Sequence, residues 1–255
     1  MLDPVVPPPA PAELLDNIIW HSLAGPHARF SVGTDEARRY APGFSPIAGF
    51  ANAGRPDFAA LAPFCAPDEH LYVGGWSGKA PAGWHVHLET SMHQMVWDAP
   101  IPEVDPAFAA VPLGAQHVPQ MLELVALRPP GPFAARTREL GDYYGVIEDG
   151  RLVAMAGERM AAGSLEYLRA ARSGIRPCGG PSGSWHEISG VCTHPDVEGR
   201  GLAWRLIAKV VRSQMQRGET PFLHVMSDNL HARRLYERMG FRFHQEVAVR
   251  VVSRL

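Results

Sequence analysis

A short glycine-containing run is the first place where this sequence could do chemistry. Gly199, Arg200, Gly201, Leu202 and Ala203 follow an apolar segment, HEISGVCT, and precede an amphipathic one, WRLIAKVVRSQMQ. These flanks predict a buried strand and a helix that meet at the glycines. A helix start carries unpaired backbone N–H groups and the positive end of the helix dipole, and glycines let a ligand approach the main chain. The run therefore predicts an anion site, with a pyrophosphate as the expected anion.

A second motif follows the next predicted strand. Its sequence is NLHARRLYERMGF, from Asn229 to Phe241. It resembles the pattern N-x-x-A-x-x-L-Y-x-x-x-G-F of the GNAT N-acetyltransferases at every fixed position. The phrases GVCTHP, GRGLA and GETPFLHV resemble the FR47-like branch of that family. The resemblance covers about residues 108–255 and implies an acyltransferase that uses acetyl-CoA.

The resemblance also implies which residues bind the cosubstrate. Backbone N–H groups from Gly199 to Ala203 are expected to hold the pyrophosphate. Val191, Cys192 and Thr193 are expected to pair with the pantetheine arm and to supply an oxyanion donor. In the family, the asparagine at the position of Asn229 contacts the CoA arm. Cys192 itself lies in an apolar strand, where a cysteine is usually a small hydrophobic residue and not a nucleophile.

Glu187 and Tyr236 are the candidate base and acid. Amine acetylation needs one group that removes a proton from the amine and another that returns a proton to the thiolate. Glu187 begins the strand HEISGV, at a position that resembles the glutamate base of many GNAT proteins, and burial there is expected to raise its pKa. Tyr236 matches the tyrosine that lies near the sulfur in the family, and a tyrosine is protonated at neutral pH. The structural alternatives are a strand-end surface glutamate and a core tyrosine.

Other polar side chains near strand ends have weaker claims. Glu158 ends the strand LVAMAGE and is interpreted first as a surface charge, with a place in the cleft as the alternative. His186, His194 and His224 are close enough to strand ends to touch substrate, although a single histidine is more often structural. The histidines and the three cysteines show no metal-ligand spacing, so no metal is expected.

Two features depart from the family pattern. Glu198 stands where the family usually has arginine or glutamine, and a solvated carboxylate near a pyrophosphate costs up to about 1 kcal/mol of binding. Arg200 and Arg205 could offset that charge. The stretch from Ala161 to Trp185 is long for a connection between two strands. It is either a flap over the substrate side or a mobile loop.

The chain divides into three parts. Residues 1–12 are rich in proline and predict a flexible lead-in. Residues 13–104 form an N-terminal half, either a degenerate GNAT-like copy or an accessory domain. Residues 105–255 are expected to form the domain that resembles the GNAT proteins, and the proline-rich run DAPIPEVDPAF predicts the boundary.

The pattern of apolar residues predicts an α/β protein. The family resemblance implies a mixed, mostly antiparallel sheet that is splayed where the cofactor enters. Helices are predicted at residues 13–23, 57–64 and 116–127, after the glycine run, and at 230–239. Strands are predicted at residues 28–32, 70–75, 93–97, 108–113, 143–147, 152–158, 187–193 and 221–225, with one or two more within 241–252.

Composition limits the possible partners and location. The chain has 24 Lys+Arg and 26 Asp+Glu residues, and this balance argues against a nucleic-acid partner. No apolar run reaches the roughly 18 residues that a membrane helix needs, and the N-terminal residues lack a signal-peptide pattern. We therefore expect no membrane partner and a cytoplasmic location.

The functional hypothesis is acetyl transfer from acetyl-CoA to a primary amine of a small molecule, by direct attack in a ternary complex. The protein is expected to be a monomer or a homodimer. Two alternatives stay open: a non-catalytic CoA-binding regulatory module, and a protein or peptide N-acetyltransferase.

Overall fold

The computed structural model describes residues 11–163 and 183–255. Within these ranges the strands form one eleven-stranded sheet in the order β1-β2-β3-β4-β11-β5-β10-β9-β8-β7-β6. Most neighbours are antiparallel, and β3–β4 and β9–β10 are parallel. The strands are β1 (Ser31–Gly33), β2 (Ala37–Tyr40), β3 (Ile47–Phe50), β4 (Leu71–Gly74), β5 (Trp84–Trp97), β6 (Val111–Pro112), β7 (Tyr143–Glu148), β8 (Arg151–Ala162), β9 (Trp185–Thr193), β10 (Thr220–Met226) and β11 (Phe241–Arg254).

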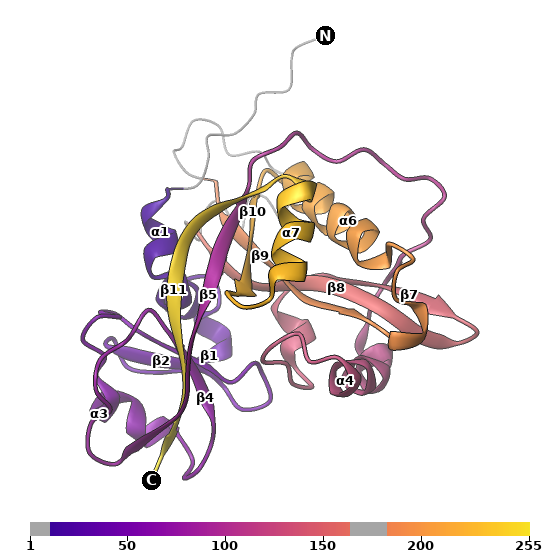
Figure 1. The fold of residues 1–255 in the computed structure, drawn as a ribbon. Coiled ribbons are helices and arrows are strands. Elements are labelled where there is room, and N and C mark those ends of the chain that lie inside the picture. The colour runs from indigo at the N-terminus through magenta and orange to yellow at the C-terminus, as the bar shows by residue number, and fades with distance from the viewer. Residues whose placement is uncertain (1–10, 164–182) are drawn as a thin grey trace.

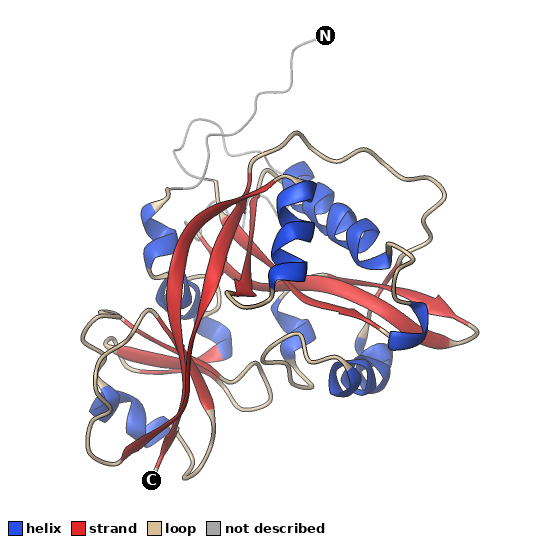
Figure 2. Cartoon of the chain, viewed as in Figure 1, coloured by secondary structure: helices blue, strands red, loops and turns tan. Residues whose placement is uncertain are grey.

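The helices of the described residues are mostly short and surround this curved sheet (Figure 2). Helix α6 follows β9, and helix α7 follows β10. The α-helices are α1 (Glu13–Asp16), α2 (Ile18–Ala24), α3 (Phe58–Leu61), α4 (Val118–Leu127), α6 (Leu202–Gln216) and α7 (Leu230–Met239). The 3₁₀ turns are η1 (Ala28–Phe30), η2 (Ala62–Phe64), η3 (Ala115–His117), η4 (Thr137–Leu140) and η5 (Pro195–Val197). No described helix has both the length and the apolar character needed to cross a membrane.

Strand β5 joins the two halves of the chain. It lies between β10 and β11, and the long β5–β11 ribbon runs from the C-terminal part of the sheet down to β4 (Figure 1). One edge of β5 pairs with β10, with Met92 opposite Met226, and the other pairs with nearly all of β11. The division at residue 105 stays a prediction about sequence units. In the structure, the residues on both sides of it belong to one sheet.

Several predicted elements have different limits in the structure. The helix expected at 13–23 is interrupted at Asn17, whose backbone is not helical. The strand expected at 28–32 begins as the 3₁₀ turn η1 and becomes β1 only at Ser31. The strand expected at 93–97 is only the end of β5, and the one expected at 108–113 shrinks to β6. The final segment is one continuous strand, β11.

Two apolar cores cover opposite faces of the central strands. Helices α6 and α7 pack on one face through residues such as Leu206 and Val210, against Leu223 and Val225 of β10. Helices α1 and α2 pack on the other face, where their core includes Phe222. Since successive side chains of a strand point to opposite faces, His224 must share the α1–α2 face with Phe222.

Two predicted segments fall largely outside the described residues. They are the proline-rich lead-in at residues 1–12 and most of the stretch from Ala161 to Trp185.

Candidate active site

Strands β9 and β10 diverge in the middle of the sheet. Their parallel pairing ends where Ile188 lies opposite Leu223, although β9 continues to Thr193 and β10 to Met226. Gly190 lies in the diverging part with a φ of +64°, and a Cβ there would stand 2.8 Å from the ring of Tyr143. The divergence leaves one edge of Val191, Cys192 and Thr193 without a neighbouring strand among the described residues. The expected splay is therefore present.

The glycine run presents free backbone donors at the start of α6. Gly201 is the N-cap of this helix with a φ of 73°, and Gly199 has a φ of 77°. A Cβ at either glycine would meet nothing within 4 Å. Among the described residues, the N–H groups from Gly199 to Ala203 have no hydrogen-bond partner. These open donors at a helix N-terminus suit an anion.

The charged side chains of this run are already paired. Both guanidinium NH groups of Arg200 donate to the carboxylate of Glu148, at 2.9 and 2.7 Å. Glu198 forms a 2.6 Å ion pair with Arg128, which follows α4. The unfavourable carboxylate that the sequence suggested is thus offset, but by Arg128 and not by Arg200. Anion binding is left to the backbone N–H groups.

Glu187 is a buried, paired carboxylate. Its side chain is 1% exposed, and Arg159 donates to both of its oxygens, from Nε at 2.9 Å and from Nη2 at 2.8 Å. Burial by itself raises the pKa of Glu187, but the charge and hydrogen bonds of Arg159 and His224 outweigh burial and lower it to about 2. The expectation of a raised pKa is therefore wrong. A carboxylate with so low a pKa is a weak proton acceptor.

His224 is the group that Glu187 orients. The ring Nδ1 lies 2.8 Å from Oε1 of Glu187, and the side chain is 4% exposed. The other ring nitrogen, Nε2, lies 3.1 Å from the amide nitrogen of Gln94, which can only donate. These partners assign the neutral tautomer with its proton on Nδ1. The lone pair on Nε2 then accepts from Gln94, and it can take a proton only from a group that replaces this donor.

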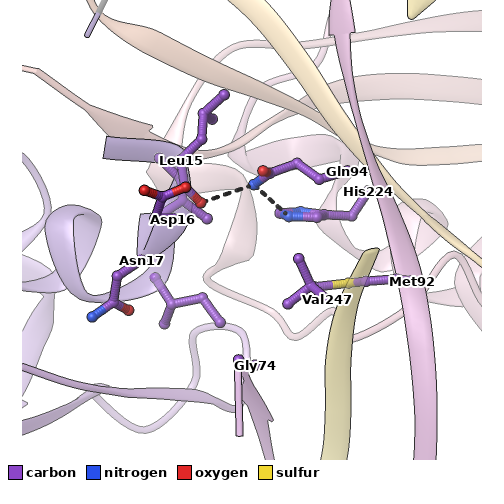
Figure 3. A pocket seen from close by; sticks show the side chains of 11 residues that line it. Leu15, Asp16, Asn17, Gly74, Met92, Gln94, His224 and Val247 are labelled. Carbon is purple, nitrogen blue, oxygen red and sulfur yellow. Dashed lines mark hydrogen bonds between the residues drawn. The ribbon is translucent and has the colours of Figure 1, made fainter. Parts of the chain in front are cut away.

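A small pocket opens beside this lone pair (Figure 3). Gln94 and His224 lie on its wall, and Nε2 of Gln94 also donates to the carbonyl of Leu15 at 3.4 Å. Gln245 donates to that same carbonyl and to Oε1 of Gln94, which fixes the orientation of the Gln94 amide. His224 is also the first residue of β10 beyond its last pair with β9. The polar groups therefore meet where the two strands separate.

Tyr236 lies on α7 in the core between the helices and the sheet. Burial, with a smaller contribution from Cys192, raises the pKa of Tyr236 to about 12. Its hydroxyl makes no hydrogen bond to any residue in the described ranges. It keeps its proton at neutral pH, as an acid must.

Asn229 is the N-cap of α7. Its Oδ1 accepts from the N–H of Ala232 at 3.1 Å, so the residue has a clear structural task. The predicted contact between Asn229 and the CoA arm stays a prediction.

Cys192 is a buried residue of β9. Burial raises the pKa of its thiol to about 12, and the thiol donates to the carbonyl of Arg128 at 3.2 Å. A thiol with so high a pKa is not a nucleophile at neutral pH.

The remaining candidates lie away from the pocket. His194 contacts Arg151 and the N–H of Asp196 in the turn before the glycine run. Glu158 is buried and paired with Arg217, which also neutralises Glu219.

His186 completes a buried group with those two glutamates, close enough in space to hold a metal ion. The guanidinium of Arg217 contacts both carboxylates and would repel a cation there. We therefore interpret this cluster as a structural ion network.

Sequence reasoning underestimated His224. Its position two residues after Phe222 in an apolar strand was a usable signal, because it places a polar ring on a buried face. Its partner Gln94 lies in β5, far away in the chain, and only the strand pairing shows that the two meet.

Comparisons with known proteins agree with this fold. The family model described as FR47-like protein matches residues 182–251. A crystal structure from Novosphingobium aromaticivorans, assigned to the GNAT acetyltransferases, is 36% identical with a TM-score of 0.79, over 94% of this chain and 98% of that one. A GCN5-related N-acetyltransferase from Kribbella flavida shares the fold at 16% identity and a TM-score of 0.55, over 96% of each chain. A comparison with curated proteins finds no match.

Proposed function

Since the chain belongs to the GNAT family of acetyltransferases, we propose that it acetylates a primary amine of a small molecule, by direct attack in a ternary complex with acetyl-CoA. The observation that carries this proposal is the position of His224. Its Nε2, which accepts a hydrogen bond from Gln94, lies beside a pocket at the point where β9 and β10 separate. A base at that position can act on an amine held in the pocket.

The residues around the splay fit acetyl-CoA. When bound, acetyl-CoA supplies the acetyl group and a thiolate leaving group. The open N–H groups from Gly199 to Ala203 suit its pyrophosphate. The unpaired edge of Val191 to Thr193 suits the amides of its pantetheine arm, because a free strand edge offers backbone donors and acceptors.

In this proposal His224, not Glu187, takes the proton from the amine. The proton goes to Nε2, and Glu187 stabilises the resulting imidazolium through its 2.8 Å contact with Nδ1. Arg159 keeps Glu187 ionised, which the low pKa of Glu187 reflects. Glu187 therefore becomes a positioning residue.

Tyr236 is the proposed acid, and its replacement tests that role. Tyr236→Phe removes the hydroxyl from a side chain that makes no hydrogen bond within the described ranges, so the fold should be unaffected. We expect kcat to fall by about 10- to 100-fold, at or below the low end of general acid catalysis. The affinity for CoA should stay nearly unchanged. Steady-state kinetics and calorimetry measure the two effects.

A matched control is Tyr144→Phe, which removes the hydroxyl that bonds Ser213 on α6. It should leave kcat within about twofold, an effect that amounts to less than 0.5 kcal/mol. Unaltered turnover in Tyr236→Phe would remove this residue from the mechanism.

The glycine run is tested by calorimetric titration with acetyl-CoA. Gly201→Val places a β-branched residue at a φ of 73°, which costs on the order of 1–2 kcal/mol of backbone strain and puts a side chain in the open space before α6. We expect micromolar binding to the unaltered protein and at least tenfold weaker binding to the variant.

Gly150→Val serves as a control, because Gly150 also has a positive φ and open space around it but lies in the β7–β8 turn. It should keep the affinity for acetyl-CoA. Equal affinity in Gly201→Val would mean that the run is only a structural turn.

Glu198 would favour the non-catalytic alternative if its charge hindered CoA binding. That charge is paired with Arg128, so this argument for the alternative is weakened. No described contact favours it or the protein and peptide alternative over the small-molecule proposal.

A further inference from the structure

The pocket beside His224 is built largely by the N-terminal half of the chain. Its walls come from the α1–α2 junction, the end of β4, and the strands β5, β10 and β11 (Figure 3). Gln94 and the carbonyl of Leu15 place the N-terminal half in direct contact with the proposed base. The N-terminal half therefore does more than cover the sheet.

The pocket is narrow. Its cavity volume is about 20 Å³, whereas a single water needs about 10–15 Å³. Gly74 accounts for part of this space, because a Cβ there would lie 2.8 Å from the end of Ile19 and 3.9 Å from the end of Met92. A cavity of this size holds little more than one water-sized group, so an acceptor that enters it must be slender and unbranched.

The pocket is apolar along its sides and acidic at its open end. Ile19, Met92 and Val247 supply apolar side chains, while Asp16 is exposed and His224 is buried. The described lining contains no lysine or arginine. The charge of Glu187 is already balanced by Arg159, so Asp16 is the unbalanced charge of the lining. It attracts a cation and repels a carboxylate.

We infer that this pocket is the acceptor site and that it selects an unbranched aminoalkyl chain with a second positive group. The reacting nitrogen takes the position of the Gln94 donor at Nε2 of His224, methylenes contact the apolar walls, and the second cation lies near Asp16. This inference rests on the proposed function, and it adds the class of acceptor and a role for the N-terminal half.

Three probes with a chain of four carbons test the charge selectivity. They are 1,4-diaminobutane, butylamine and 4-aminobutanoate, whose far ends are positive, neutral and negative. Calorimetric titration at pH 8, with and without saturating CoA, should rank the diamine tightest and 4-aminobutanoate weakest. Asp16→Asn should weaken diamine binding by about threefold, as expected for a solvent-exposed charge pair, and should leave butylamine unchanged.

Glu13→Gln is the matched control, because it removes the same charge from the same helix outside the pocket lining. Its binding of all three probes should equal that of the unaltered protein. Gly74→Ala should weaken all three by a similar factor, since it narrows the pocket without changing its charge. The inference is overturned if 4-aminobutanoate binds best, if Asp16→Asn leaves the diamine-to-butylamine ratio unchanged, or if none of the probes binds.

Release of CoA from acetyl-CoA separates this inference from the proposed function. Binding in the predicted order without CoA release with any amine would support the pocket and contradict the proposed transferase activity. CoA release that depends on anionic or bulky amines would support the activity and overturn the selectivity.

Discussion

Replacing His224 with asparagine is expected to lower kcat by about 10²- to 10⁴-fold, the contribution typical of a general base. The asparagine amide can still donate to Glu187 in place of Nδ1, so the buried carboxylate keeps a partner. It cannot accept a proton as Nε2 of His224 does. The affinity for acetyl-CoA should stay within about threefold, because the proposed cofactor contacts lie elsewhere, and a threefold change amounts to less than 1 kcal/mol.

The control for this variant is His231→Gln. His231 is an exposed histidine on α7, and its replacement should leave kcat unchanged. Near-normal kcat in His224→Asn would exclude His224 as the base.

The sequence predicted the parts of the site that depend on local pattern. The glycine run, the apolar face of α6 and the limits of α7 each need only a few neighbouring residues to be recognised. In the structure Asn229 caps α7 and Gly240 ends it with a φ of 113°, which accounts for the predicted limits of 230–239. Local hydrogen bonding and periodicity dictate these features, so one sequence suffices.

The parts it missed depend on pairing between distant segments. Only the end of β5 was predicted, because the rest of this strand, WHVHLETSM, buries only Trp84 and otherwise has exposed or partly buried residues without a buried apolar face. Its place between β10 and β11 brings Gln94 to His224. The pKa of Glu187 likewise depends on Arg159, which reaches it from the neighbouring strand β8. The pKa of Glu187 is lowered because the cationic Arg159 lies opposite it. Spacing in the sequence does not reveal which charge lies opposite a buried carboxylate.

Replacing Arg159 with methionine is expected to destabilise the protein by about 3–5 kcal/mol, the cost of leaving one charge of a buried pair without its partner. Methionine keeps much of the length of the arginine side chain, so the lost packing is small. Glu187, 1% exposed, would lose both guanidinium hydrogen bonds. Urea unfolding, followed by circular dichroism, measures the change in the free energy of unfolding.

The same pair makes stability depend on pH. The pKa of Glu187 in the folded protein, about 2, is below its ordinary value of 4.5. The folded state therefore binds this proton less readily than the unfolded state, and the stabilisation is fully present above pH 4.5. It is lost as the pH falls from 4.5 toward 2. Arg159→Met should show a weaker loss over this range, because its Glu187 has lost the cation that lowers the pKa.

The double variant Arg159→Met/Glu187→Gln separates the buried charge from lost packing. Removing both charges leaves no uncompensated ion, so it should recover a large part of the stability that Arg159→Met loses. Arg242→Met is the surface control, since its 2.9 Å pair with Asp98 is 62% exposed on both sides and such pairs contribute about 0–1 kcal/mol. A loss as small in Arg159→Met as in Arg242→Met would contradict the buried-pair account. The base would then be His224 without a carboxylate held in place to stabilise its charged form, and the proposed role of Glu187 would have to be abandoned.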